Sequence, residues 1–227
     1  MVQISPSAPS NVSEYAEACL NALAAAGLGD RISLGGAFGL LHYLDYRSTH
    51  DVDAWWSDSV TKEERRVVVR VLSETLSAFG QVRMRQWGDV ISVELQAGGR
   101  TAFSFQIANR SARLREPVPS PWGIPLDSFE DLLASKMVAL VERGAPRDFL
   151  DIYAVCQAGL ATPTECWELW RRRQESSGSD INDRRARLAV ESHLMRIVNH
   201  RPLESIKDTT ERKEARKVRE WFKQEFL

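Results

Sequence analysis

The sequence predicts an α+β fold, in which a sheet with flanking helices is followed by a bundle of helices. Within the first 116 residues, helical and strand-like apolar patterns alternate, and three strand-like segments then follow in a row. Beyond residue 126 every regular pattern is helical, and the stretch in between is rich in proline. We therefore expect a sheet domain at 1–116, an extended Pro-rich crossing at 117–125 and a helical domain at 126–227.

Capping residues and the spacing of apolar side chains place the elements of the sheet domain. The first helix follows a cap at Ser10 or Asn11 and ends at the glycines that come after residue 26. The later elements are expected as a strand at 32–34, a helix at 37–46, a strand at 51–56, a helix at 61–79, and strands at 82–87, 90–96 and 102–108. The glycine-containing pairs at 88–89 and 98–99 separate the last three strands and are typical of hairpin turns.

The helical domain begins at a capping signal, because Ser128 is followed three residues later by Asp131. Its first helix should run to about Arg143, where the segment 144–146 contains a glycine and a proline that interrupt it. Four more helices are expected near 148–158, 163–174, 182–199 and 209–226.

Composition narrows the class of protein. The chain has 227 residues, of which 43% are hydrophobic and 27% charged, as in ordinary globular proteins. No apolar run approaches the roughly 20 residues that span a bilayer, and the first residues lack the pattern of a signal peptide. The three cysteines have no paired spacing, which argues against a disulfide framework and a zinc site. We therefore expect a cytoplasmic protein without a membrane anchor.

Charge is distributed unevenly along the chain. Acidic residues outnumber basic ones in the first 60 residues, whereas residues 181–227 hold twelve Lys and Arg against eight Asp and Glu. An acidic front half suits metal binding, and a basic tail suits contact with a polyanion. For the tail, we favour the plainer interpretation of a solvated helix surface, and contact with RNA stays the alternative.

Two carboxylates open the expected strand at 51–56. Successive side chains of a strand point to opposite faces, so Asp51 and Asp53 share one face while Val52 points away. Carboxylates this close repel each other unless a cation bridges them, and hard oxygen ligands suit Mg²⁺ or Mn²⁺. Trp55 and Trp56 continue the strand, so one of them faces the carboxylate side. Stacking on a nucleobase and packing in the core are both open for that indole.

The segment before this strand offers groups that bind phosphate. Gly35 and Gly36 form a turn into a helix, where free backbone N–H groups and the helix dipole favour an anion. Arg47 follows that helix and adds a planar guanidinium that matches phosphate oxygens. A metal held by the two aspartates would clamp phosphate oxygens nearby.

This ordered set resembles the signature of the nucleotidyltransferase superfold, which DNA polymerase β shares, and more narrowly the AbiEii/AbiGii toxin family. The matching residues are Gly35–Gly36 and Arg47–Asp53. A second motif, Lys136–Arg143 followed by Arg147–Tyr153, is similar to the family's Lys-x-x-Ala-Leu … Arg … Arg-Asp-Phe-x-Asp-Leu-Tyr stretch. The resemblance covers residues 30–160 and implies a polymerase β-like mixed sheet with flanking helices.

The resemblance also implies roles for single residues. Asp51 and Asp53 would bind Mg²⁺ or Mn²⁺, and Gly35–Gly36 would cradle the triphosphate of an NTP. Lys136 would touch the phosphates of the nucleotide, and Asp148 would lie near the acceptor or orient it. These implied roles make Asp51, Asp53, Lys136 and Asp148 the candidate catalytic residues.

The residues of the second motif allow a structural interpretation as well. On a helix, Lys136 and Arg143 lie on one face, so that two cations would face one anion. Asp148 and Asp151 are three residues apart near a helix start and would bind Arg143 or Arg147 instead. A buried ion-pair network is therefore an equal alternative to a functional role for the second motif, except at Lys136, where we favour function.

Two positions depart from the family pattern. Ala37 stands where many members carry a Ser or Thr after the glycines, so one hydroxyl contact to phosphate is missing. Gln106 stands where a third acid is expected, and a neutral amide is a weaker Mg²⁺ ligand than a carboxylate. Glu94 on the neighbouring strand would complete the metal site if its side chain faces the same way.

The sequence therefore predicts a metal-dependent nucleotidyltransferase, the toxin of a toxin–antitoxin or phage-defence system. It would transfer a nucleotidyl group from an NTP to an RNA, such as a tRNA 3′ end, or to a protein, and an antitoxin protein would be its partner. The alternative is a nucleotidyltransferase fold with a degraded site that binds a nucleotide or a partner without turnover. A third hypothesis is an antitoxin-like or structural partner that acts through the helical half.

Overall fold

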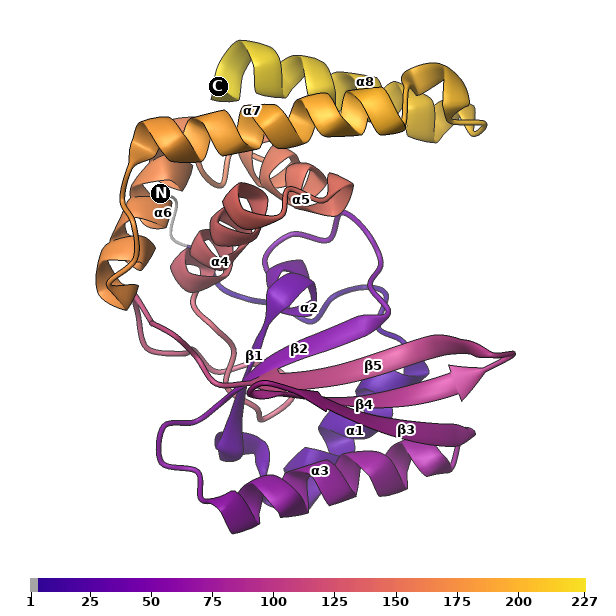
Figure 1. Cartoon of the computed structure of the whole chain (residues 1–227). Helices are drawn as coiled ribbons and strands as arrows, with labels where there is room; N and C mark the ends of the chain where they lie inside the picture. Colours follow the sequence, from indigo (N-terminus) through magenta and orange to yellow (C-terminus); the bar gives the residue numbers. More distant parts are fainter. Residues whose placement is uncertain (1–3) are drawn as a thin grey trace. The chain divides into compact units, whose positions relative to one another are not determined.

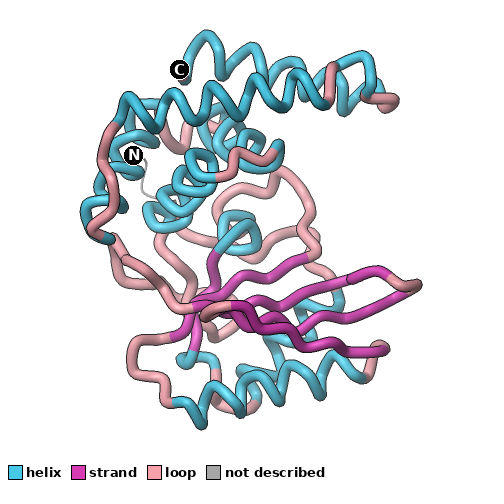
Figure 2. The backbone as a smooth tube through the Cα atoms, in the orientation of Figure 1, coloured by secondary structure: helices cyan, strands magenta, loops and turns pink. Residues whose placement is uncertain are grey.

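A computed structural model describes residues 4–227, which form two compact units (Figure 1). The sheet unit comprises the described residues 4–132, and the helical unit comprises residues 133–227. All strands lie in the sheet unit, and helices make up most of the other (Figure 2). None of the helices in residues 4–227 is long and apolar enough to cross a bilayer.

Five strands form one mixed sheet in the order β1-β2-β5-β4-β3. Strands β2 and β5 run parallel, and the other neighbouring strands are antiparallel. The bounds are Ile32–Gly35 for β1, Asp51–Trp56 for β2, Gln81–Trp87 for β3, Val90–Ala97 for β4 and Arg100–Ala108 for β5. The expected α+β class with a mixed sheet and flanking helices is therefore confirmed.

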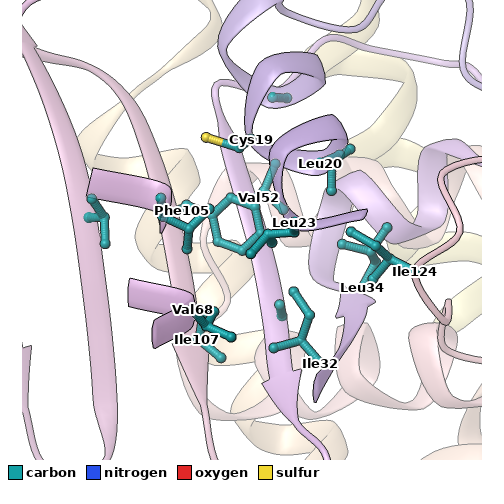
Figure 3. Packing of buried hydrophobic residues seen from close by; sticks show 14 of the residues in the cluster. Cys19, Leu20, Leu23, Ile32, Leu34, Val52, Val68, Phe105, Ile107 and Ile124 are labelled. Atoms are coloured by element: carbon teal, nitrogen blue, oxygen red, sulfur yellow. The ribbon is translucent and has the colours of Figure 1, made fainter. Parts of the chain in front are cut away.

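Helices α1 and α3 pack on one face of the sheet (Figure 1). Helix α1 spans Glu14–Ala25 and is capped by Ser13, and α3 spans Lys62–Ser77 behind a capping box at Thr61. A close view of the core shows Leu20, Leu23, Val68, Ile32, Leu34, Val52, Phe105 and Ile107 packed together (Figure 3). Each fully buried aliphatic side chain stabilises the fold by about 1.5–3 kcal/mol, so this face holds the sheet in place.

Helix α2, Gly36–Leu41, is shorter than the helix expected at 37–46. Two backbone carbonyl groups near its end, those of Phe38 and His42, have partners outside the helical hydrogen-bond pattern. The His42 carbonyl accepts the Ser7 N–H at 2.8 Å, and the Phe38 carbonyl lies 2.9 Å from Nδ1 of His42. These contacts replace the bonds that another helical turn would need, and the apolar pattern alone does not reveal them.

The helical unit is built from α5 to α8 and from the part of α4 that follows residue 132. The bounds are Phe129–Glu142 for α4, Pro146–Gln157 for α5, Pro163–Ser177 for α6, Asp183–His200 for α7 and Thr209–Trp221 for α8. Short 3₁₀ turns at Gly29–Arg31 and Leu203–Ser205 and a π-helical segment at Phe222–Phe226 complete the described elements of the chain. Aromatic side chains fill much of this core, where Phe149 packs edge-on against Phe222 and Trp167 against Trp170.

Candidate active site

Successive side chains of strand β2 alternate between the apolar core and a polar face of the sheet. Three side chains are buried in the core with α1 and α3, namely Val52, Ala54 and Trp56. Asp51, Asp53 and Trp55 alternate with them and are half-buried on the other face. The strand therefore carries the two carboxylates and one indole on a single polar face, and Trp55 is the tryptophan that accompanies them.

A row of polar residues crosses three strands at Asp51. Asp51 pairs with Ser104 of β5, and Ser104 pairs with Glu94 of β4. The Ser104 hydroxyl donates to Oδ1 of Asp51 at 2.7 Å, and Nε2 of Gln106 donates to the Ser104 hydroxyl at 3.2 Å. Within residues 4–227 no cation pairs with Asp51, so a hydroxyl orients this carboxylate without neutralising its charge.

The glycine pair is fitted to the side chains of β2. Gly35 pairs with Asp53 across β1 and β2, and its missing Cβ leaves space for the Trp55 indole. Gly36 has a φ of +59°, and a Cβ on it would collide with the Asp53 carboxylate. Glycine is therefore required at both positions for the backbone to lie against Asp53 and Trp55.

A buried ion pair supports Trp55 from one side. The Arg110 guanidinium lies 5.4 Å from the centre of the Trp55 ring and donates to the Ser33 hydroxyl at 2.9 Å. It also pairs with Asp127, whose second carboxylate oxygen has no hydrogen-bond partner among the described residues. Burial raises the pKa of Asp127, while Arg110 opposes the shift. Sequence reasoning missed Arg110 and Asp127, since each lies in a connection without a motif.

Glu94 is held apart from the two aspartates. It lies two strand spacings from Asp51, about 9–10 Å. Its carboxylate accepts from Gln96 at 3.2 Å and lies 3.7 Å from the Arg85 guanidinium. Among residues 4–227 no three acidic, histidine or cysteine side chains gather to hold a metal. The expected set of Asp51, Asp53 and Glu94 is therefore not brought together, although Glu94 faces the same side.

Arg47 lies in the connection between α2 and β2 and is half-buried. Its guanidinium packs 5.6 Å from the centre of the Tyr46 ring and donates to the Ser48 carbonyl at 3.1 Å. A contact between Arg47 and phosphate stays a prediction.

The two aspartates suit a divalent cation. Mg²⁺ is usually held by one or two carboxylates, with water and substrate phosphates completing the shell. Asp51 and Asp53 provide such a pair on one face, and the space at Gly36 accommodates the Asp53 carboxylate. Gln106 pairs with Asp53 across β2 and β5, so a neutral amide lies beside the pair where a third acid was expected.

The second motif forms two ion pairs in the helical unit. Nζ of Lys136 lies 2.6 Å from Oδ2 of Asp151, and both side chains are buried. Arg143 donates to both carboxylate oxygens of Asp148, at 2.8 and 2.9 Å. The Ala145 N–H also donates to Asp148, at 3.0 Å. The Arg143–Asp148 pair considered from the sequence is therefore present, whereas the pairing of Asp151 with Lys136 was not considered. The functional roles of Lys136 and Asp148 stay predictions.

Comparison with known proteins identifies the family. Residues 18–224 match the model of the AbiEii nucleotidyl transferase toxin of type IV toxin–antitoxin systems. The crystal structure of JHP933 from Helicobacter pylori is similar with a TM-score of 0.52 and 14% identity, covering 94% of this chain and 96% of that one. A second H. pylori structure, described provisionally as a nucleotidyltransferase, has a TM-score of 0.50 and 14% identity and covers 94% and 98%.

These structural likenesses show the fold, and the family match covers most of the chain. No curated protein matched the sequence. The glycine pair and the two aspartates lie inside the matched region. The chain thus belongs to the AbiEii family of nucleotidyl transferase toxins of type IV toxin–antitoxin systems.

Proposed function

We propose that this chain is a metal-dependent nucleotidyltransferase that transfers a nucleotidyl group from an NTP to an RNA or protein acceptor. One observation carries the proposal. Asp51 and Asp53 share a polar sheet face with a glycine pair fitted against them, and a hydroxyl rather than a cation orients Asp51. The family is one of toxins that act in toxin–antitoxin systems, so an antitoxin would be the partner and phage defence the setting.

Each residue of the site has a distinct role in the proposed reaction. Asp51 and Asp53 would hold Mg²⁺ or Mn²⁺, which supplies charge neutralisation for the triphosphate. Ser104 keeps the Asp51 carboxylate in place. The acceptor hydroxyl would attack the α-phosphorus, and pyrophosphate would leave as its bond to that phosphorus breaks. The Gln106 amide cannot take the acceptor proton, which leaves Asp148 or the substrate itself for that task.

The backbone at Gly35–Gly36 and the side chains of Arg47 and Lys136 would bind the phosphates of the nucleotide. The absence of a Cβ at the glycine pair lets a ligand approach the backbone closely. Lys136 would serve only if a phosphate competes with its partner Asp151. These assignments rest on the family resemblance together with the positions described above.

The test removes the charge of Asp51 without changing its size. Wild-type protein and Asp51→Asn are incubated with each labelled NTP, Mg²⁺ or Mn²⁺ and total RNA, and labelled RNA and self-labelled protein are measured. We expect the variant to lose at least about a hundredfold in rate, which corresponds to about 2.7 kcal/mol in the barrier. Asp58→Asn, at an exposed carboxylate, is the matched control and should keep full activity. Undiminished transfer by Asp51→Asn contradicts the proposal.

A second candidate function is nucleotide or partner binding without turnover. Gln106 beside Asp53 favours it, because the described residues offer no third carboxylate to the metal. The distinguishing variant is Gln106→Glu. If the wild-type protein binds an NTP but transfers nothing, and Gln106→Glu restores transfer, the native site is a binding site.

A further inference from the structure

A groove of about 780 Å³ lies in the sheet unit between α3 and the edge strand β3. Five cationic residues line it, namely Lys62, Arg65, Arg66, Arg70 and Arg85. Among the described residues, Asp89 is the one acidic residue of the lining. The charge of this groove is therefore strongly positive, although the whole chain has a formal net charge of −1.

Three of these cations form a row along α3. Lys62, Arg66 and Arg70 are four residues apart, so each lies one turn, about 6 Å, beyond the previous one. Like charges at this spacing repel and destabilise a helix. The opposite side of α3, with Val68 and Leu72, is buried in the core. The row thus faces outward at a cost to the helix that an anionic ligand would offset.

Nearby acids compensate little of this charge. Arg66 pairs with Glu63 at 3.1 Å, but both side chains are about three-quarters exposed, and such pairs contribute little. Lys62 and Arg70 form no ion pair within residues 4–227. The Asp89 carboxylate accepts the Asn109 N–H at 3.1 Å and keeps its charge, so it offsets only one of the five cations of the lining.

The floor and the rim of the groove suit a nucleic acid strand. Val69, Met84 and Ile91 give the lining an apolar part, and Met84 is 62% exposed. Strand β3 is an edge strand, and its Arg85 pairs with Ser92 of β4. Ser92 in turn pairs with Gln106 of β5, which pairs with Asp53 of β2. Directly paired residues lie on the same face of a sheet, so Arg85 is on the face of Asp53. Arg85 lies 3.7 Å from the buried Glu94 carboxylate, but its own side chain is half-exposed, so a guanidinium is available at the β3 edge on the face that carries Asp51 and Asp53.

We propose that the groove between α3 and β3 docks the phosphodiester backbone of an RNA acceptor. This inference rests on the proposed function and gives the acceptor its class. Evenly spaced cations match the repeating charge of a phosphate backbone, and the guanidinium groups match phosphate oxygens. An RNA strand that follows the groove and crosses the β3 edge reaches the polar face of the sheet.

The experiment measures binding apart from catalysis. The full-length protein is titrated into a fluorescein-labelled RNA oligonucleotide of mixed sequence, and anisotropy gives Kd at a series of salt concentrations. The groove variant is Lys62→Ala/Arg66→Ala/Arg70→Ala, in which alanine preserves helix propensity. We expect Kd to rise tenfold or more, and the slope of log K against log salt to become shallower by about 2. Circular dichroism confirms that the variant is folded.

The matched control is Lys213→Ala/Arg216→Ala/Lys217→Ala, which removes the same charge from the exposed surface of α8. It should bind RNA as the wild-type protein does. Unchanged affinity and slope in the groove variant, or an equal loss in the control, overturn the proposal. Equal competition by polyglutamate also overturns it, because the groove would then accept any polyanion.

The groove variant and Asp51→Asn, each measured for RNA binding and for nucleotide transfer, test this inference and the proposed function separately. Asp51→Asn should bind the RNA normally while it loses transfer. If Asp51→Asn transfers nucleotide undiminished while the groove variant loses RNA affinity, the proposed chemistry fails and the groove stands. If the groove variant binds RNA normally and Asp51→Asn is inactive, the groove fails and the chemistry stands.

Discussion

Aspartates in the sheet unit and in the helical unit have different surroundings. Asp51 is half-buried, and a hydroxyl donates to it. Asp148 and Asp151 are fully buried, and each forms an ion pair with a cation of the same chain. A carboxylate oriented by a neutral donor keeps its charge for an incoming cation, whereas a neutralised one fixes local geometry. The same residue type is therefore suited to binding a cationic ligand in one unit and forms internal ion pairs in the other.

The largest expected effect comes from breaking the buried pair of the helical unit. Lys136→Met should lower the free energy of unfolding by about 3–5 kcal/mol, because Asp151 keeps its buried charge after the Lys136 ammonium is removed. The double variant Lys136→Met/Asp151→Leu should regain most of this stability, since replacing both charges by apolar groups is often neutral. Urea unfolding of the purified variants measures both changes.

Transfer activity then separates the two roles of Lys136. If it touches the phosphates of the nucleotide, the double variant regains stability but not transfer. Recovery of both would make Lys136 a purely structural residue. Arg147→Met, at an exposed position on the same helix as Asp151, is the control and should change neither quantity by much. A single variant as stable as the wild-type protein would show that the ion pair contributes little.

The next effect compares glycines in the two units. Gly36 and Gly144 both have positive φ, and a Cβ at either would collide with a neighbouring side chain, Asp53 or His193. Alanine at either position should cost about 1–2 kcal/mol for the left-handed backbone alone. Gly36→Ala should also slow nucleotide transfer by tenfold or more, because Asp53 must move. Gly144→Ala should keep transfer per folded molecule.

A third glycine isolates the effect of the backbone. Gly88 has a φ of +57° and open space where a Cβ would lie. Gly88→Ala should therefore show the strain without any collision and without loss of transfer. Equal loss of transfer in Gly36→Ala and Gly144→Ala would mean that the space beside Asp53 does not matter for the site. Thermal unfolding and the labelled-NTP assay measure the two effects separately.

Sequence periodicity was sufficient to predict which side chains share a face of the sheet, but not how far apart side chains on different strands lie. Alternation in β2 placed Asp51 and Asp53 together, since a strand has a fixed period. Glu94 does face their side, yet the strand order inserts β5 between β4 and β2, and a pattern along one strand does not contain that order. Arg110 and Asp127 are 17 residues apart in connections, and only the folded chain brings them together. Local patterns therefore predict faces and ends, while cross-strand neighbours depend on topology.

The smallest predicted effect is a dependence of stability on pH through His42, which follows the helix that begins at Gly36. Burial lowers the pKa of His42 from its ordinary 6.5, partly opposed by hydrogen bonds to the backbone of Phe38 and Gly39. Nε2 of His42 accepts the Trp122 indole N–H at 2.9 Å, which requires a neutral ring. Because the folded state binds this proton less readily than the unfolded chain, His42 stabilises the fold fully above pH 6.5 and less as pH falls below it.

Unfolding of the wild-type protein and of His42→Gln at about pH 8 and about pH 5.5 isolates this contribution from that of the carboxylates. The loss of stability on acidification should be smaller in His42→Gln, because glutamine does not titrate. Equal losses in both proteins would show that His42 does not link the fold to pH. Because His42 directly follows α2, its protonation should loosen the helix that begins at Gly36, and transfer should then decline over the same pH range as stability.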